Sequence, residues 1–178
     1  MEIGIKKLFS SFSSGSKWKK YTNSKQYGKN AITHLPKASE ITEDFCKQNA
    51  HSYRLQYKES LETMKTTSNP TVFFYRYDMA IKKAIGLAYM QEKITIPGES
   101  LAKEADKLIE TKDTYITQMI ERATADVKRD LEELSAPADI SKKLNSFEKK
   151  MKRHSDEMNS THIETIEKTV DALMKQYL

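Results

Sequence analysis

The sequence contains a single cysteine, Cys46, in 178 residues. An internal disulfide needs two cysteines and a multi-cysteine zinc site needs several, so neither is expected. A chain that does not use disulfides fits a reducing compartment, and we expect a cytoplasmic location. Cys46 begins a row of apolar residues at helical spacing, so we expect it to be buried as a small hydrophobic residue rather than to act as a nucleophile.

Glycine is also scarce, and three of the five glycines (Gly4, Gly15 and Gly28) lie in the first 28 residues. The remaining two, Gly86 and Gly98, cannot form a Gly-rich phosphate loop, so a doubly wound nucleotide-binding fold is not expected. The chain also lacks the nucleophile elbow, the zinc-protease helix motif and the EF-hand loop. We therefore expect a protein that is not an enzyme, and the sequence indicates no cofactor and no small-molecule substrate.

Long apolar runs are missing as well. The longest extends from Ala84 to Met90, whereas a membrane-spanning helix needs about 20 residues. Leu8 and Phe9 are followed at once by serines, so no secretory signal is expected at the start. Hydrophobic residues make up 38% and charged residues 31% of the chain, which is typical of a charge-rich helical protein.

Acidic residues are nearly absent from residues 1–38, which carry Glu2 against eight lysines and no arginine. This segment alone has a charge of +7 while the whole chain has +5, so residues 39–178 carry −2. Serine-rich composition, low hydrophobicity and high charge favour disorder. We expect a flexible basic arm over residues 1–38 that is separate from a helical domain over residues 39–178.

The arm combines cations with aromatic and apolar residues. Ile5, Leu8, Phe9 and Phe12 have the spacing of a short amphipathic helix, and residues 17–21 alternate lysines with Trp18 and Tyr21. An anionic membrane surface and a nucleic acid both fit residues 3–20, and a solvated or self-docking tail is the third interpretation. Lysine without arginine indicates charge attraction rather than base reading. The candidate contacts are Lys6, Lys7, Phe9, Lys17, Trp18, Lys19 and Lys20.

Apolar periodicity in residues 39–178 predicts four helices, at about 40–67, 70–93, 99–135 and 139–177. Ser39 or Thr42 is a candidate cap for the first. Asn69 and Pro70 fit the N-cap and first position of the second. Apolar residues cover most of that second helix, so we expect it to lie in the core. Its core-facing stripe comprises Phe73, Tyr77, Ala80, Ile81, Ala84, Leu87 and Ala88.

The last two predicted helices have apolar residues at intervals of three and four, close to the heptad seam of a coiled coil. Their similar length and the break at Pro137, with Asp139 as cap, predict one long antiparallel hairpin. The spacing from Met158 to His162 to Ile166 predicts a local change of supercoil. In this pairing, the basic first half of the last helix faces acids of the preceding one, among them Asp126 and Asp130.

Two histidines, His154 and His162, fall on the predicted seam of the last helix. They are about 12 Å apart along a helix axis, which is too far for one metal ion. None of the four histidines has a glutamate three residues before it, as a di-iron bundle would need. We expect buried structural histidines, with a pH-sensitive seam as the functional alternative.

These patterns predict a mostly α fold, an elongated bundle of about four helices with a long antiparallel hairpin and a basic flexible N-terminal arm. The leading hypothesis is a non-enzymatic helical interaction or scaffold protein that binds a protein partner or self-associates through the 99–177 hairpin. The alternative is a peripheral binder of an anionic membrane or nucleic acid through the arm. A metal-binding or enzymatic bundle is the third.

Overall fold

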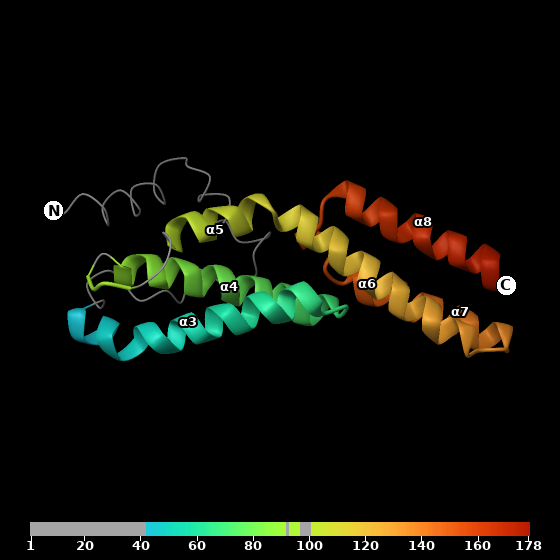
Figure 1. Cartoon of the computed structure of the whole chain (residues 1–178). Helices are drawn as coiled ribbons and strands as arrows, with labels where there is room; N and C mark the ends of the chain where they lie inside the picture. The colour runs from blue at the N-terminus through green and yellow to red at the C-terminus, as the bar shows by residue number, and fades with distance from the viewer. Residues whose placement is uncertain (1–41, 92, 97–100) are drawn as a thin grey trace. The chain divides into compact units, whose positions relative to one another are not determined.

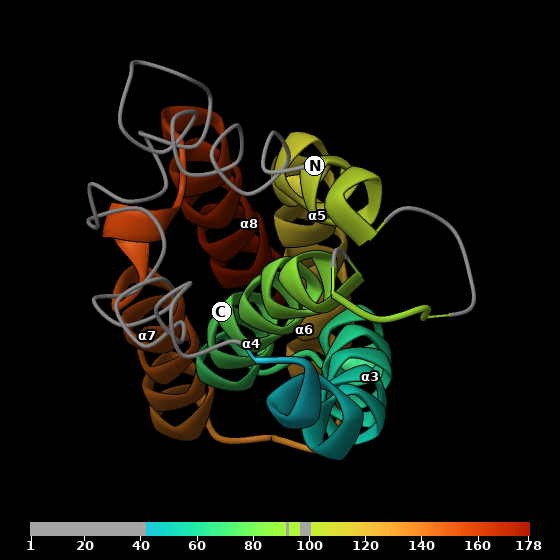
Figure 2. The same ribbon diagram turned by 90° about the vertical axis from the view of Figure 1, so that its left-hand side faces the viewer.

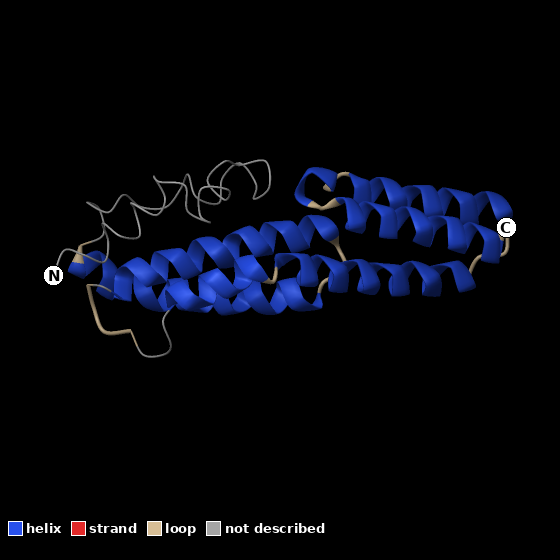
Figure 3. Ribbon diagram, turned by 90° about the horizontal axis from the view of Figure 1, so that it is seen from above, coloured by secondary structure: helices blue, strands red, loops and turns tan. Residues whose placement is uncertain are grey.

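The computed structural model describes residues 42–91, 93–96 and 101–178. The described part of the chain is mostly helical: 86% of it is helix, and it forms six α-helices and no strand (Figure 3). The prediction of a mostly α fold is therefore confirmed. The helices are α3 (Glu43–Thr66), α4 (Pro70–Gln91), α5 (Leu101–Glu110), α6 (Lys112–Glu132), α7 (Pro137–Lys152) and α8 (Ser160–Tyr177), with a short 3-10 helix η2 (Ser155–Glu157) between the last two.

The chain divides into two compact units. The first comprises Met1–Met64 and Phe74–Thr111, and the second comprises Lys65–Phe73 and Lys112–Leu178. The first unit thus contains most of α3, most of α4 and all of α5. The second contains α6, α7, α8 and the turn that joins α3 to α4.

In the first unit, α4 lies between α3 and α5 (Figures 1 and 2). The carboxylate of Glu59 on α3 lies 3.6 Å from the guanidinium of Arg76 on α4, and Lys83 lies over the ring of Tyr53. The earlier residue of α3, Tyr53, thus contacts the later residue of α4, Lys83, while Glu59 contacts Arg76. The two helices are therefore antiparallel. The Tyr77 hydroxyl donates a hydrogen bond to the Leu108 carbonyl of α5 at 3.1 Å.

Both helix starts that the sequence predicted here are confirmed. The Thr42 hydroxyl accepts a hydrogen bond from the Phe45 amide at 3.1 Å, and the Asn69 side chain accepts one from the Thr71 amide at 3.1 Å. Such side-chain caps satisfy amides that the first turn of a helix leaves unpaired. Every residue of the predicted core-facing stripe of α4 is buried, as is Cys46.

In the second unit, α7 packs against α8, and α6 packs against both. Figures 1 and 2 show α7 and α8 side by side. The core consists of one apolar stripe from each helix. These stripes include Ile116, Met119, Ile120, Val127 and Leu131 of α6, Ile140, Leu144, Phe147 and Met151 of α7, and Ile166, Val170 and Leu173 of α8.

The prediction of one continuous helix over 139–177 is wrong, and with it the long two-helix hairpin. The chain leaves the helix after Lys152 and begins α8 at Ser160. Asn159 is the N-cap of α8 and forms a capping box with His162, which starts a new helix in a new direction. Folding back lets α7 and α8 bury their apolar stripes against each other. The step from Met158 to His162 therefore marks a chain reversal and not a change of supercoil.

Two smaller predictions also differ from the structure. The predicted helix 99–135 is divided at Thr111 into α5 and α6. Pro137 occupies the first turn of α7 with Ala136 as N-cap, so Asp139 lies inside the first turn instead of capping the helix. An acid in that turn still interacts favourably with the helix dipole.

Within the described part of the chain, no helix is long and apolar enough to cross a membrane.

Candidate functional site

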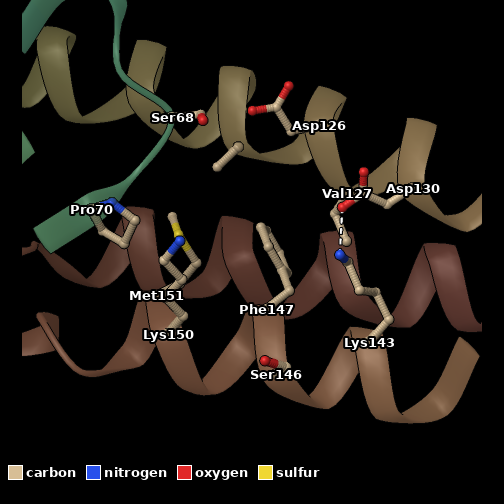
Figure 4. Close-up of a pocket in the computed structure, with 11 residues that line it drawn as sticks. Ser68, Pro70, Asp126, Val127, Asp130, Lys143, Ser146, Phe147, Lys150 and Met151 are labelled. Carbon is tan, nitrogen blue, oxygen red and sulfur yellow. Dashed lines mark ion pairs between the residues drawn. The ribbon is translucent and has the colours of Figure 1, made fainter. Parts of the chain in front are cut away.

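The second unit has a groove between α6 and α7. It has a cavity volume of about 290 Å³, and Figure 4 shows the residues that line it. Val127, Phe147 and Met151 form an apolar floor that belongs to the core of the unit. Charged side chains stand on both walls, Asp126 and Asp130 from α6 and Lys143 and Lys150 from α7. We call this site the α6–α7 groove.

The turn between α3 and α4 closes one end of the α6–α7 groove. Arg122 on α6 donates a hydrogen bond through Nε to the Thr67 carbonyl at 3.0 Å. The Ser68 side chain hydrogen-bonds Asp126, and this bond is the main reason that the pKa of Asp126 lies below its usual value. Pro70, the first residue of α4, lines the same end (Figure 4). The turn is thus held to α6 by two side chains one helical turn apart.

Most of the charge in the α6–α7 groove is already paired. Lys143 Nζ lies 2.5 Å from Asp130 Oδ2, with both side chains about half exposed, and Arg129 pairs with Asp126. Exposed pairs of this kind stabilise a protein by only about 0.2–1 kcal/mol. Lys150 is exposed and forms no ion pair within the part of the chain that the structure describes. The charge of Lys150 also lowers the pKa of Asp126, but no ion pair among the described residues occupies its ammonium group.

The dimensions of the α6–α7 groove limit what it can hold. Pockets that enclose a small ligand measure about 300–1,000 Å³, so 290 Å³ lies at the lower limit. Such a volume accommodates one or two side chains of a protein segment. Apolar atoms on the floor and charges at the rim resemble the layout of a protein interface, with an apolar centre and a polar edge.

A second cavity, of about 400 Å³, lies between α6 and the first turns of α8. Threonines contribute much of its lining, Thr114 and Thr117 from α6 and Thr161 and Thr165 from α8. His162 also lines it but is only 5% exposed. The hydroxyls of Thr117 and Thr165 each donate to the carbonyl four residues earlier, so part of this polar lining is engaged within its own helix.

The hydrogen bonds of His162 define its tautomer. The Asn159 amide donates to Nδ1 at 3.4 Å, so Nδ1 is the unprotonated nitrogen. The proton is then on Nε2, which lies 3.2 Å from the Asp113 carbonyl and 3.3 Å from the Thr117 hydroxyl. The imidazole therefore joins the start of α8 to the first turn of α6.

The α7–α8 connection also contains an ion pair shielded from water. Lys112 Nζ lies 3.5 Å from Glu157 Oε2, and the two side chains are only 7% and 11% exposed. Burial raises the pKa of Glu157, and the positive charge of Lys112 partly opposes this rise. Such a pair adds little net stability because both charges lose hydration, but removing one partner leaves an uncompensated buried charge.

His154 lies in the same connection, at the N-cap of η2. Its Nε2 is 3.0 Å from the Thr71 hydroxyl in the first turn of α4. Burial lowers the pKa of His154, with a smaller opposing effect from the nearby Asp156 carboxylate. His154 and His162 thus lie on two different elements rather than on one helical seam, and their pH sensitivity stays a prediction.

The predicted arm contacts, Lys6, Lys7, Phe9, Lys17, Trp18, Lys19 and Lys20, lie outside the described residues. Within residues 42–91, 93–96 and 101–178, no group of three His, Cys, Asp or Glu side chains could hold a metal ion. The sequence missed Lys112 and the capping role of Asn159. The motif Asn159-Ser160-Thr161-His162 carried a signal for the latter, because asparagine is a strong N-cap.

A comparison with known proteins completes the description of the site: no family model, no curated protein and no solved structure matches this chain.

Proposed function

We propose that this chain is a non-enzymatic helical interaction protein that docks a segment of a protein partner in the α6–α7 groove. The observation that supports this most directly is the combination of an apolar floor at Val127, Phe147 and Met151 with charged walls from two helices. An apolar side chain of the partner would enter the groove, and polar contacts at the rim would orient the segment.

The charge of the groove indicates the chemistry of the partner. Asp126 and Asp130 are already engaged by Arg129 and Lys143, whereas Lys150 has no ion pair in the described part of the chain. A carboxylate of the partner next to its apolar side chain would pair with Lys150. We therefore propose an acidic segment with one apolar anchor.

We also propose the finer organisation that the sequence indicates, in which residues 39–178 act as one helical bundle domain and residues 1–38 as a separate basic arm. The proposed location is the cytoplasm. The second candidate source of the docked segment is another copy of the chain, since α6, α7 and α8 all lie in the 99–177 region expected to self-associate. Contact of the arm with a membrane surface or nucleic acid is the alternative function.

The test is a selection from a displayed library of random peptides against the full chain. Two variants that place tryptophan on α7 provide the comparison. Ser146 lines the groove, so Ser146→Trp would fill it, whereas exposed Asn145 does not line it and Asn145→Trp serves as the matched control.

The proposal predicts enriched peptides with an apolar residue beside acidic ones. Their binding would be lost at least tenfold in Ser146→Trp and kept in Asn145→Trp. Enriched peptides that bind Ser146→Trp as well as the natural chain, or no enrichment at all, would contradict it. Enrichment of sequences from the chain itself, with a mass in light scattering that grows with concentration, would identify a second copy as the occupant.

A further inference from the structure

The exposed face of α7 carries cations that the fold leaves unpaired. Two of the six basic residues between 142 and 153 are engaged: Lys143 pairs with Asp130, and Lys152 with Glu148 and Glu167. The others are exposed and form no ion pair with any residue that the structure describes. They are Lys142, Lys149, Lys150 and Arg153.

Three of these cations form a straight row. At about 100° per residue, Lys142, Lys149 and Arg153 fall within roughly 40° of one another around the helix axis. Along the axis they span about 16 Å. We call Lys142, Lys149 and Arg153 the α7 basic row. Lys150 is adjacent but lines the α6–α7 groove, so it is not counted in the row.

Acidic side chains near α7 do not neutralise the basic row. Asp126 of α6 interacts with Lys150, and Glu148 is bound by Lys152. Asp139 lies in the first turn of α7, and Asp156 lies beyond its end, where its charge acts on His154. The exposed face of α7 is therefore positive over about three turns of helix, from Lys142 to Arg153.

We propose that the α7 basic row binds the phosphate backbone of a nucleic acid, independently of the α6–α7 groove and of residues 1–38. The phosphates of a nucleic acid are spaced along its backbone, as the cations of the α7 basic row are spaced along the helix. Duplex DNA presents one charge per about 1.7 Å of axis, so a 16 Å row would face several phosphates.

The polar character of this face favours nucleic acid over the other anionic partners. Asn145, which is exposed and does not line the groove, lies between Lys142 and Lys149, and such a side chain commonly donates hydrogen bonds to phosphate oxygens. Helices that lie on membranes place aromatic or aliphatic residues beside their cations, and protein interfaces contain a buried apolar centre. The α7 basic row has neither. Binding through lysine and arginine to phosphates alone would be insensitive to base sequence.

The test uses the full chain with a fluorescent 20-base-pair duplex at 50–200 mM salt. The row variant, Lys142→Gln with Lys149→Gln and Arg153→Gln, removes three charges but leaves the groove lining intact. The control, Lys58→Gln with Lys65→Gln and Lys175→Gln, removes three exposed lysines from α3 and α8. Both variants have the same net charge, and circular dichroism verifies that both stay helical.

Three lost phosphate contacts correspond to a change of about 2.7 in the slope of log K against log salt. We expect that reduction in the row variant and a change below 1 in the control. The proposal is overturned if the natural chain does not bind the duplex at 50 mM salt, or if both variants change equally. It is also overturned if the row variant loses binding to anionic vesicles but not to the duplex, which would assign the row to a membrane. None of these outcomes depends on peptide binding in the groove.

Discussion

The ring of Tyr53 occupies the space that a side chain at position 86 would need. A Cβ added to Gly86 on α4 would lie 2.8 Å from Cε2 of Tyr53 on α3, well inside van der Waals contact. Lys83 on α4 also contacts this ring, with its Nζ 3.7 Å from the ring centroid. A side chain at position 86 would therefore displace the Tyr53 ring from its place between α3 and α4.

Gly86→Ala should therefore destabilise the protein, although alanine has the higher helix propensity. The propensity gain is about 1 kcal/mol, and overpacking costs about 1–3 kcal/mol, so we expect a net loss of about 1 kcal/mol in urea unfolding. In a Tyr53→Ala background the clash is absent, and the same substitution should stabilise by about 1 kcal/mol. An equal effect in both backgrounds would rule out the close approach.

Substitution of Ser60, unlike that of Gly86, should stabilise the protein. Its side chain is fully buried, and its hydroxyl has no hydrogen-bond partner among the residues that the structure describes. A buried polar group without a partner costs about 1–3 kcal/mol. Ser60→Ala should raise the free energy of unfolding by about 1 kcal/mol, measured by urea titration. A loss of stability would mean that the hydroxyl is bonded in solution.

Asn159 should control the start of α8. Its side chain accepts a hydrogen bond from the His162 amide at 3.0 Å. Removing an N-cap costs about 1 kcal/mol, so Asn159→Ala should destabilise by that amount in thermal unfolding. Asn159→Ser keeps an acceptor and should cost only a few tenths of a kcal/mol. If both substitutions are equally harmless, the cap is not formed.

Substitutions of Lys112 and Glu157 should have non-additive effects on the free energy of unfolding. Lys112→Met leaves the Glu157 carboxylate buried beside an apolar side chain, and breaking a buried pair typically costs about 3–5 kcal/mol. The side chains of Lys112 and Glu157 are only 7% and 11% exposed, so replacing both with apolar residues should recover most of the lost stability. A double-mutant cycle with Glu157→Leu measures the coupling, and simple additivity of the two losses would contradict the pairing.

His154 predicts how stability varies with pH. Because burial lowers its pKa in the folded state, the unfolded state binds the proton more tightly. The contribution of His154 is complete above the unfolded pKa of about 6.5 and is lost as the pH falls through the folded value. Asp156 and Arg153 act on the ring with opposite signs. His154→Gln should therefore flatten the decline in stability below about pH 6.5; an unchanged profile would contradict the burial of the ring.

The sequence predicted best those features that depend on the residues of a single helix, namely where the helix starts and which face is buried. Asn69 and Pro70 start α4 as predicted, and the α4 stripe is buried, because a cap and an apolar period act locally. Charge matching also predicted that the basic first half of the last helix faces acids of the preceding helix, and the ion pair between Lys143 and Asp130 agrees with this. The cap and the apolar stripe need no knowledge of distant chain segments, whereas the charge match needs only the neighbouring helix.

The chain reversal after Lys152 could not be predicted from periodicity alone. Apolar spacing continues through His154, Met158 and His162, so the pattern of one long helix persists across the break. The choice between a straight helix and a reversal depends on what α7 and α8 bury against each other, which is a tertiary effect. Burial of Lys112 likewise depends on Glu157, 45 residues away.

Docking of an acidic segment in the α6–α7 groove can be observed most directly by amide chemical shifts. The full ¹⁵N-labelled chain would be titrated with a selected acidic peptide and, separately, with a peptide in which its acids are replaced by lysine. The proposal predicts that shifts concentrate on groove residues such as Val127, Phe147 and Lys150, and that the lysine peptide causes none. Shifts that fall on α3 or α5, or equal shifts with both peptides, would contradict it.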